Sequence, residues 1–99
     1  MPAYIIAQAE EVLDPAGLQR YVEEVTPLLA KYGGHYIGFS DQVQALDGDW
    51  RPPVVAIIEF PSGDQIRAFW NDPDYPPMKE LRHQSARTQL IAFDSPPPA

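Results

Sequence analysis

Residues 53–60, with the sequence PVVAIIEF, constrain the fold of this chain more than any other segment. An apolar run with a single charge, at Glu59, is typical of a β-strand that is buried in a sheet. A chain of 99 residues has room for one hydrophobic core only. The whole chain is therefore expected to form one domain that contains this strand.

Three other segments have the alternating or β-branched pattern of strands. They cover residues 4–10, 35–40 and 89–93. Residues 43–46 resemble a ragged continuation of the second of these strands, and Asp47-Gly48-Asp49 has the composition of a turn.

A long amphipathic helix is expected between the first two strands. Asp14-Pro15 combines an N-cap residue with a proline at the first helical position. Apolar residues spaced by four, three and four positions, from Leu18 to Leu29, place one helix face against the core. Pro27 is expected to bend or split this helix, and Gly33-Gly34 to end it.

A second helical region follows the strand at 53–60. Residues 62–65 form a capping box that starts a helix, and the proline-rich segment 72–77 interrupts it. A further helix is predicted over about 78–86, with three residues facing inward, namely Met78, Leu81 and Ser85.

The resulting order, β-α-β-β-α-β, predicts an α+β domain with a ferredoxin-like fold. Its sheet is expected to be antiparallel, with strand order 4-1-3-2 and the helices on one face. The domain is expected to cover residues 1–94. Residues 95–99 are expected to form a short proline-rich tail that adds nothing to the core.

Alternation divides the strand side chains between two faces. A small residue near the middle of each strand predicts the face toward the helices, namely Ala7, Gly38, Ala56 and Ala92. The opposite face then holds Tyr4, Ile6, Gln8, His35, Ile37, Phe39, Val55, Ile57, Glu59, Gln89, Ile91 and Phe93. Because nothing in the chain is left to cover so apolar a face, we expect a homodimer whose two sheets close around a shared cavity. The alternative is an open sheet that the protein tolerates.

Composition excludes several classes of function. Fourteen acidic against seven basic residues give a net charge of −7, which argues against binding of nucleic acids or anionic membranes. The absence of cysteine excludes thiolate metal sites, and two histidines far apart in the sequence do not indicate a metal site. No cofactor or metal is therefore expected. No apolar run approaches the ~18 residues of a membrane span, and the first residues lack a charged leader, so we expect a cytoplasmic protein.

One group of side chains stands out as a candidate active site. The expected strand order brings Tyr4, His35 and Glu59 to one edge of the sheet, on the face that lines the shared cavity. A half-buried carboxylate beside an imidazole and a phenol is suited to act as a general base or to anchor a polar group of a ligand. The alternative is a structural hydrogen-bonded cluster at the dimer seam.

Four further residues are candidates for binding a ligand: Arg82, Trp50, Tyr75 and Phe39. Arg82 pairs with a carboxylate, reaches the mouth of the cavity or is a solvated helix residue. Trp50, in the hairpin between the second and third strands, is either a ligand platform or a packing residue between subunits. Tyr75 is equally well explained as a cap at the break between the last two helical segments. Phe39 belongs to the face that lines the cavity.

The sequence resembles a known family over about residues 4–93. The resemblance rests on Tyr4, Asp14-Pro15, Tyr32-Gly33-Gly34, Leu46-Asp47-Gly48-Asp49-Trp50, Ile58-Glu59-Phe60-Pro61-Ser62, Asp72-Pro73-Asp74-Tyr75 and Leu81-Arg82. These segments look like the domain-of-unknown-function family 1330, in which arginine often stands at the position of His35. That family belongs to the dimeric α/β-barrel superfamily, so the resemblance implies a ferredoxin-like homodimer with a central cavity. Relatives in the superfamily include small cofactor-independent monooxygenases, muconolactone isomerase-like enzymes and stress-responsive barrel proteins.

Two classes of function remain open from the sequence. The first is a small enzyme that acts on a hydrophobic or aromatic metabolite in the cavity, with oxygenase, isomerase or decarboxylase chemistry and no bound metal. The second is a non-catalytic ligand-binding or stress-related dimer that uses the same cavity. The fold alone does not choose between them.

Overall fold

The computed structural model describes residues 1–96, and the end of the predicted tail, residues 97–99, lies outside the described residues. The elements follow one another in the order β1 (Ala3–Val12), α1 (Pro15–Lys31), β2 (His35–Ser40), β3 (Val54–Phe60), α2 (Gly63–Trp70), α3 (Tyr75–Ser85) and β4 (Ala86–Asp94). All strand pairs are antiparallel, and the strand order β2-β3-β1-β4 is the predicted order 4-1-3-2 read from the other edge. The α+β, ferredoxin-like fold is thus confirmed.

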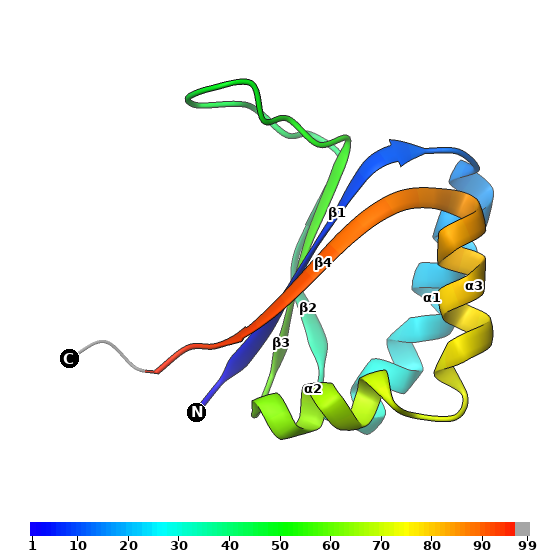
Figure 1. Cartoon of the computed structure of the whole chain (residues 1–99), viewed down its shortest axis with the longest axis vertical. Coiled ribbons are helices and arrows are strands. Elements are labelled where there is room, and N and C mark those ends of the chain that lie inside the picture. Colours follow the sequence, from blue (N-terminus) through cyan, green and yellow to red (C-terminus); the bar gives the residue numbers. More distant parts are fainter. Residues whose placement is uncertain (97–99) are drawn as a thin grey trace.

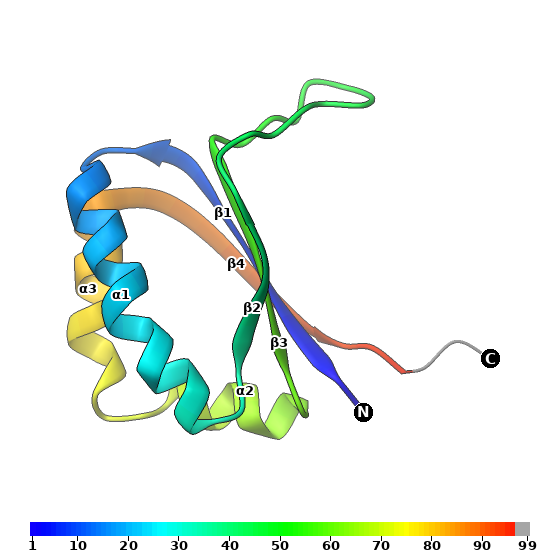
Figure 2. The same cartoon turned by 180° about the vertical axis from the view of Figure 1, so that it is seen from behind.

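The sheet and the helices form two layers (Figure 1). The three helices lie on one side of the sheet, and β1 and β4 bend at one end so that they reach α1 and α3. The long connection between β2 and β3 projects away from the helices (Figure 2). Within residues 1–96 no helix covers the opposite face of the sheet, which leaves that face open.

Prolines account for two differences between the predicted and observed helices. Helix α1 continues through Pro27 without a split. Pro27 cannot donate a hydrogen bond to the carbonyl of Glu23, but both residues lie on the exposed side of the helix, where water can bond to that carbonyl. Helix α3 begins at Tyr75 and includes Pro76 and Pro77 in its first turn. Amides in the first turn have no partner within the helix, so proline is tolerated there and does not break it.

The strand boundaries also differ from the prediction. The proposed continuation at residues 43–46 is wrong, because no strand is formed between Ser40 and Val54. The last strand is longer than predicted and begins at Ala86, directly after α3. At the end of β4, the amide of Ser95 donates a 2.9 Å hydrogen bond to the carbonyl of Pro2, so the start of the predicted tail is tied to the N-terminal segment.

A β-bulge changes which side chains of β2 face the helices. Tyr36 pairs with Ile58, but Gly38 already pairs with Ile57, so Ile37 is an extra residue in the strand. An inserted residue reverses the alternation beyond it. Phe39 therefore pairs with Ala56 on the helix side of the sheet, and the predicted placement of Phe39 and Gly38 is wrong.

The core is filled by large side chains at one end of the molecule. Phe60 from β3, Phe69 from α2 and Tyr75 from α3 are almost fully buried, and the ring centroids of Phe69 and Tyr75 lie 4.7 Å apart. Glycine is required where α1 leads into β2, because Gly33 has φ +78° and a Cβ on Gly34 would lie 2.6 Å from the Phe60 ring. The sheet and the helices are thus packed tightly at the end where α2 lies.

Candidate functional site

At the other end of the molecule a cavity lies between the sheet and the helices. The strands present small side chains to it, namely Ala7, Ala9 and Ala56. We expected such residues to let the helices settle close to the sheet, but they instead leave a cavity of about 60 Å³. Its remaining lining is mostly apolar or aromatic and includes Leu18, Tyr21, Val22, Tyr36, Phe39, Ile58 and Leu90.

An outer groove of about 550 Å³ adjoins this cavity. The two share the side chains of Leu18, Val22, Phe39 and Val54, so the groove leads to the cavity between α1 and the strands β2 and β3. Pockets that bind small organic ligands usually have volumes of about 300–1,000 Å³. The cavity alone is smaller than this range, whereas the cavity and groove together fall within it.

Within the part of the chain that the structure describes, Arg82 is the one charged side chain on the wall of the cavity. Its residue is only 5% exposed, its Nη1 donates a hydrogen bond to Thr88 Oγ1, and its guanidinium carbon lies 5.8 Å from the centroid of the Tyr21 ring. The expectation of a solvated helix position is therefore wrong. The sequence already held the signal, because Arg82 follows Met78 by four residues and precedes Ser85 by three, which places it on the inward helix face.

Neutral phenols belong to the same part of the core as the arginine, and the ring of Tyr21 contacts it directly. The hydroxyl groups of Tyr21 and Tyr75 share a 3.0 Å hydrogen bond. Burial is the main cause that raises the pKa of Tyr21 far above its usual value, and burial raises the pKa of Tyr36 to about 12. Both phenols are protonated at neutral pH and can donate hydrogen bonds. Sequence reasoning singled out none of Tyr21, Tyr36 and Thr88 as a site residue.

The predicted cluster of Tyr4, His35 and Glu59 does come together, on the open face of the sheet. Tyr4 and His35 are both paired with Glu59 across the sheet, and His35 Nε2 lies 3.6 Å from Glu59 Oε1. Hydrogen bonding to Glu59 is the main cause that raises the pKa of Tyr4, and burial and the carboxylate charge add to it. In the single chain the His35 side chain is 62% exposed and that of Glu59 is 36% exposed. The cavity lies on the other side of the sheet.

The four predicted ligand-binding residues divide between the two faces. Arg82 and Phe39 line the cavity on the helix side. Tyr75 is buried in the core beside it, with its hydroxyl bonded to Tyr21. Trp50 lies on the open side, where its indole Nε1 donates a 2.8 Å hydrogen bond to Gln8 Oε1.

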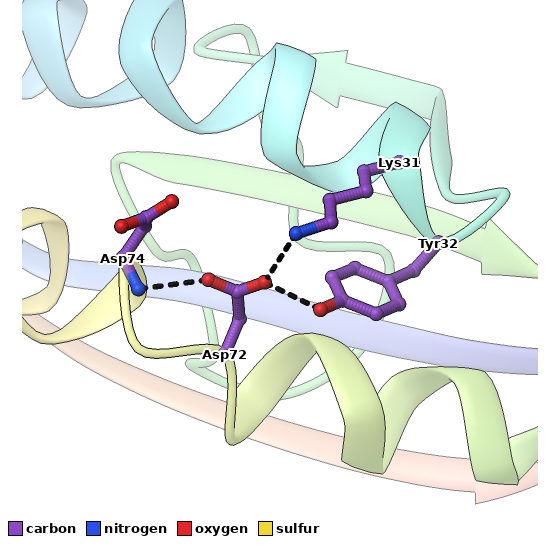
Figure 3. Close-up of polar contacts among 4 residues, drawn as sticks. All are labelled: Lys31, Tyr32, Asp72 and Asp74. Atoms are coloured by element: carbon purple, nitrogen blue, oxygen red, sulfur yellow. Dashed lines mark hydrogen bonds and ion pairs between the residues drawn. The ribbon is translucent and has the colours of Figure 1, made fainter.

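A buried carboxylate fixes the position of α3, the helix that carries Arg82. Asp72, in the connection between α2 and α3, accepts hydrogen bonds from the Tyr32 hydroxyl, from Lys31 Nζ at 3.0 Å and from the Asp74 amide at 2.7 Å (Figure 3). These contacts tie the start of α3 to the end of α1. The hydrogen bond from Tyr32 is the main cause that lowers the pKa of Asp72 to about 2.

The depressed pKa predicts how Asp72 contributes to acid stability. The pKa of Asp72 is lower in the folded protein than in the unfolded chain, so the charged carboxylate stabilises the fold. This stabilisation is complete above the usual pKa of 3.8 and is lost as the pH falls toward about 2. Asp72→Asn is expected to lower the melting temperature at neutral pH and to flatten its decline between about pH 5 and 2. The check is a melting curve at each pH, with Asp64→Asn at an exposed carboxylate as the control. Parallel declines for wild type and Asp72→Asn would contradict the prediction.

Residues 1–96 hold neither a metal site nor a membrane-spanning helix. No group of three or more His, Asp or Glu side chains lies in an arrangement that could hold a metal ion within this range. None of the helices described is long and apolar enough to cross a membrane.

Comparisons with known proteins agree with the fold. The chain matches solved structures of a protein of unknown function from Rhodopseudomonas palustris (TM-score 0.76, 20% identity, 98% of this chain and 84% of the other). It also matches SnoaB, a cofactor-independent oxygenase from Streptomyces nogalater (TM-score 0.70, 13% identity, 98% and 95% of the two chains). A third match is a dimeric ferredoxin-like protein of unknown function from Thermobifida fusca (TM-score 0.64, 15% identity, 94% and 90%).

No curated protein sequence matches the chain. The family model for the domain of unknown function DUF1330 matches residues 2–95. This match covers nearly the whole sequence and confirms the resemblance seen in its motifs. The protein therefore belongs to the DUF1330 family.

Proposed function

We propose that this protein is a homodimer that binds a small hydrophobic or aromatic metabolite in the cavity between the sheet and the helices. The observation that supports this most is the cavity itself, with its apolar wall, its buried arginine and its continuation into the outer groove. A mostly apolar pocket with a few polar groups is the usual form of a small-molecule site.

The open face of the sheet supports the homodimer. Its side chains include Ile37, Ile57, Ile91 and Phe93, and Ile91 is 62% exposed in the single chain. An apolar face of this kind is favourable only when it is covered. The similar structure from Thermobifida fusca is described as dimeric. A second copy that covers this face would leave the cavity of each subunit accessible on the helix side.

The chemistry that we propose for the cavity is that of a cofactor-independent oxygenase or isomerase, and SnoaB, which has a similar fold, is described as such an oxygenase. A guanidinium in a dry pocket stabilises negative charge that develops on a substrate, and neutral tyrosines donate hydrogen bonds to it. A second candidate is non-catalytic ligand binding. It is favoured by the lining of the inner cavity, where no carboxylate or imidazole among residues 1–96 is present to act as a base, and Asp41 lines the outer groove only.

The test of ligand binding is a variant that fills the cavity. Ala7→Leu places three more carbon atoms against the cavity and is expected to keep or raise the melting temperature. A thermal-shift screen of small aromatic metabolites should find compounds that stabilise wild type and have no effect on Ala7→Leu. Ile6→Leu, on the opposite face, is the control and should respond as wild type does. Compounds that stabilise all three proteins equally, or no stabilising compound at all, would contradict the proposal.

The cluster of Tyr4, His35 and Glu59 has its own test, because it lies on the other side of the sheet. In the proposed dimer it would lie at the seam, where a charged pair fixes orientation more than it adds affinity. Glu59→Gln is expected to weaken the dimer by on the order of a few-fold and to leave binding in the cavity unchanged, as measured by light scattering and thermal shift. Loss of ligand binding with the dimer intact would instead assign to this cluster the predicted role of anchoring a polar group of the ligand.

A further inference from the structure

The buried guanidinium of Arg82 includes an N–H donor that has no hydrogen-bond acceptor. Its Nη1 is bonded to Thr88, but its Nε has no hydrogen-bond partner, although the residue is only 5% exposed. Among residues 1–96, none of the ion pairs involves Arg82. A cation is therefore buried on the wall of a cavity with no carboxylate beside it.

This arrangement lowers the stability of the folded protein. Burial of a charge is unfavourable unless the charge is paired and hydrogen-bonded. The aromatic ring of Tyr21 attracts the guanidinium, but it supplies no formal negative charge. Tyr21 and Tyr36 are phenols, which are neutral at pH 7, and burial raises the pKa of each further. Among residues 1–96, no side chain on the cavity wall thus neutralises the arginine, in a chain whose net charge is −7.

We propose that the ligand of the cavity is an aromatic or similarly apolar molecule with one carboxylate, which accepts hydrogen bonds from the Arg82 guanidinium. This inference rests on the proposed function, because it assigns a chemical class to the ligand of the same cavity. The apolar lining receives the hydrocarbon part, and Tyr21, Tyr36 and Phe39 supply aromatic side chains for it. A carboxylate fits better than a phosphate because the one guanidinium balances the single negative charge of a carboxylate, whereas a phosphate monoester carries a charge of about −1.5 to −2 at neutral pH.

Thr88 gives the arginine a fixed position. Its hydroxyl accepts the hydrogen bond from Nη1, and it also lines the cavity. This contact holds the guanidinium at Nη1, and the buried Nε of the same group remains a donor without a partner. Such preorganisation lowers the entropic cost of binding an anion, because the side chain is already ordered.

The experiment compares charged and neutral probes of the same shape. Benzoate and phenylacetate are titrated into the full chain by calorimetry, beside benzyl alcohol and 2-phenylethanol. Wild type is expected to bind each carboxylate about ten-fold or more tightly than the matching alcohol, because hydrogen bonds to a charged partner are the stronger ones. Arg82→Met keeps an unbranched apolar side chain and should remove this preference while the alcohols still bind. Because the buried charge is removed, the melting temperature should stay equal or rise.

The outcomes separate this inference from the proposed function. Equal binding of carboxylates and alcohols to wild type, or an unchanged preference in Arg82→Met, would overturn the inference and leave the cavity as a site for neutral ligands. If neither kind of probe binds to wild type, both the inference and the proposed function fail. The comparison on wild type needs no variant, so it decides the matter even if Arg82→Met does not fold. Arg82→Lys should retain part of the preference for carboxylates over alcohols, because lysine keeps the positive charge but lacks the planar pair of N–H donors of the guanidinium.

Discussion

Ile57→Lys is expected to convert the proposed dimer into monomers or to make the protein insoluble. Ile57 lies in the middle of β3, and its neighbours across the open face include Ile6 of β1. A second sheet packed on this face would bury the lysine ammonium without a partner, which is strongly unfavourable. Light scattering at micromolar concentration should give about twice the chain mass of 11.1 kDa for wild type and the chain mass for any soluble variant.

The control for this variant adds the same charge where no interface is expected. Ala30→Lys lies on the exposed side of α1 and should leave the dimer intact. A wild-type protein that is monomeric at this concentration would contradict the homodimer. An Ile57→Lys variant that remains a stable dimer would show that the subunits associate through another surface.

Phe69→Ala is expected to have the largest effect on the stability of the fold. Phe69 is 2% exposed, and its ring lies 5.8 Å from that of Phe60 and 4.7 Å from that of Tyr75. Replacing a buried phenylalanine by alanine costs about 3–5 kcal/mol of unfolding free energy, because a cavity remains. The melting temperature should fall by more than roughly 12 °C, given about 4–8 °C per kcal/mol for a domain of this size.

The matched control removes an apolar side chain that packs against nothing. Leu46 is 93% exposed in the connection between β2 and β3, and Leu46→Ala should change the unfolding free energy by no more than about 0.5 kcal/mol. Calorimetric melting of both variants checks the difference. Equal melting temperatures for Phe69→Ala and wild type would contradict the described packing of α2 against the sheet.

The sequence was sufficient for the topology because each element has its own local signal. Asp14-Pro15 starts α1 and Ser62 caps α2 by accepting a hydrogen bond from the amide of Gln65. Once the order of the helices and strands is known, the preferred handedness of the connections and the pairing of neighbouring strands allow few topologies. The bulge at Ile37 could not be predicted, because an inserted residue is set by pairing with β3 and has no signal of its own in the alternation.

The candidate site was predictable in part. Tyr4, His35 and Glu59 were expected to be neighbours, and their pairing across the sheet follows from strand order. The cavity was missed because the small residues Ala7 and Ala56 favour close helix packing as much as an empty space. Whether a helix approaches them depends on how all the side chains between the two layers pack together. That is a property of three-dimensional packing and has no local pattern.

The central claim is that the ligand binds on the helix side of the sheet and not at the open face. The most direct measurement is a methyl NMR titration of the full chain with benzoate and benzyl alcohol, followed at the Ile, Leu and Val side chains. The account predicts shifts at the cavity residues Leu18, Val22, Ile58 and Leu90, with the methyl groups of Ile6, Ile57 and Ile91 on the open face unchanged. Shifts confined to the open-face methyl groups would contradict it.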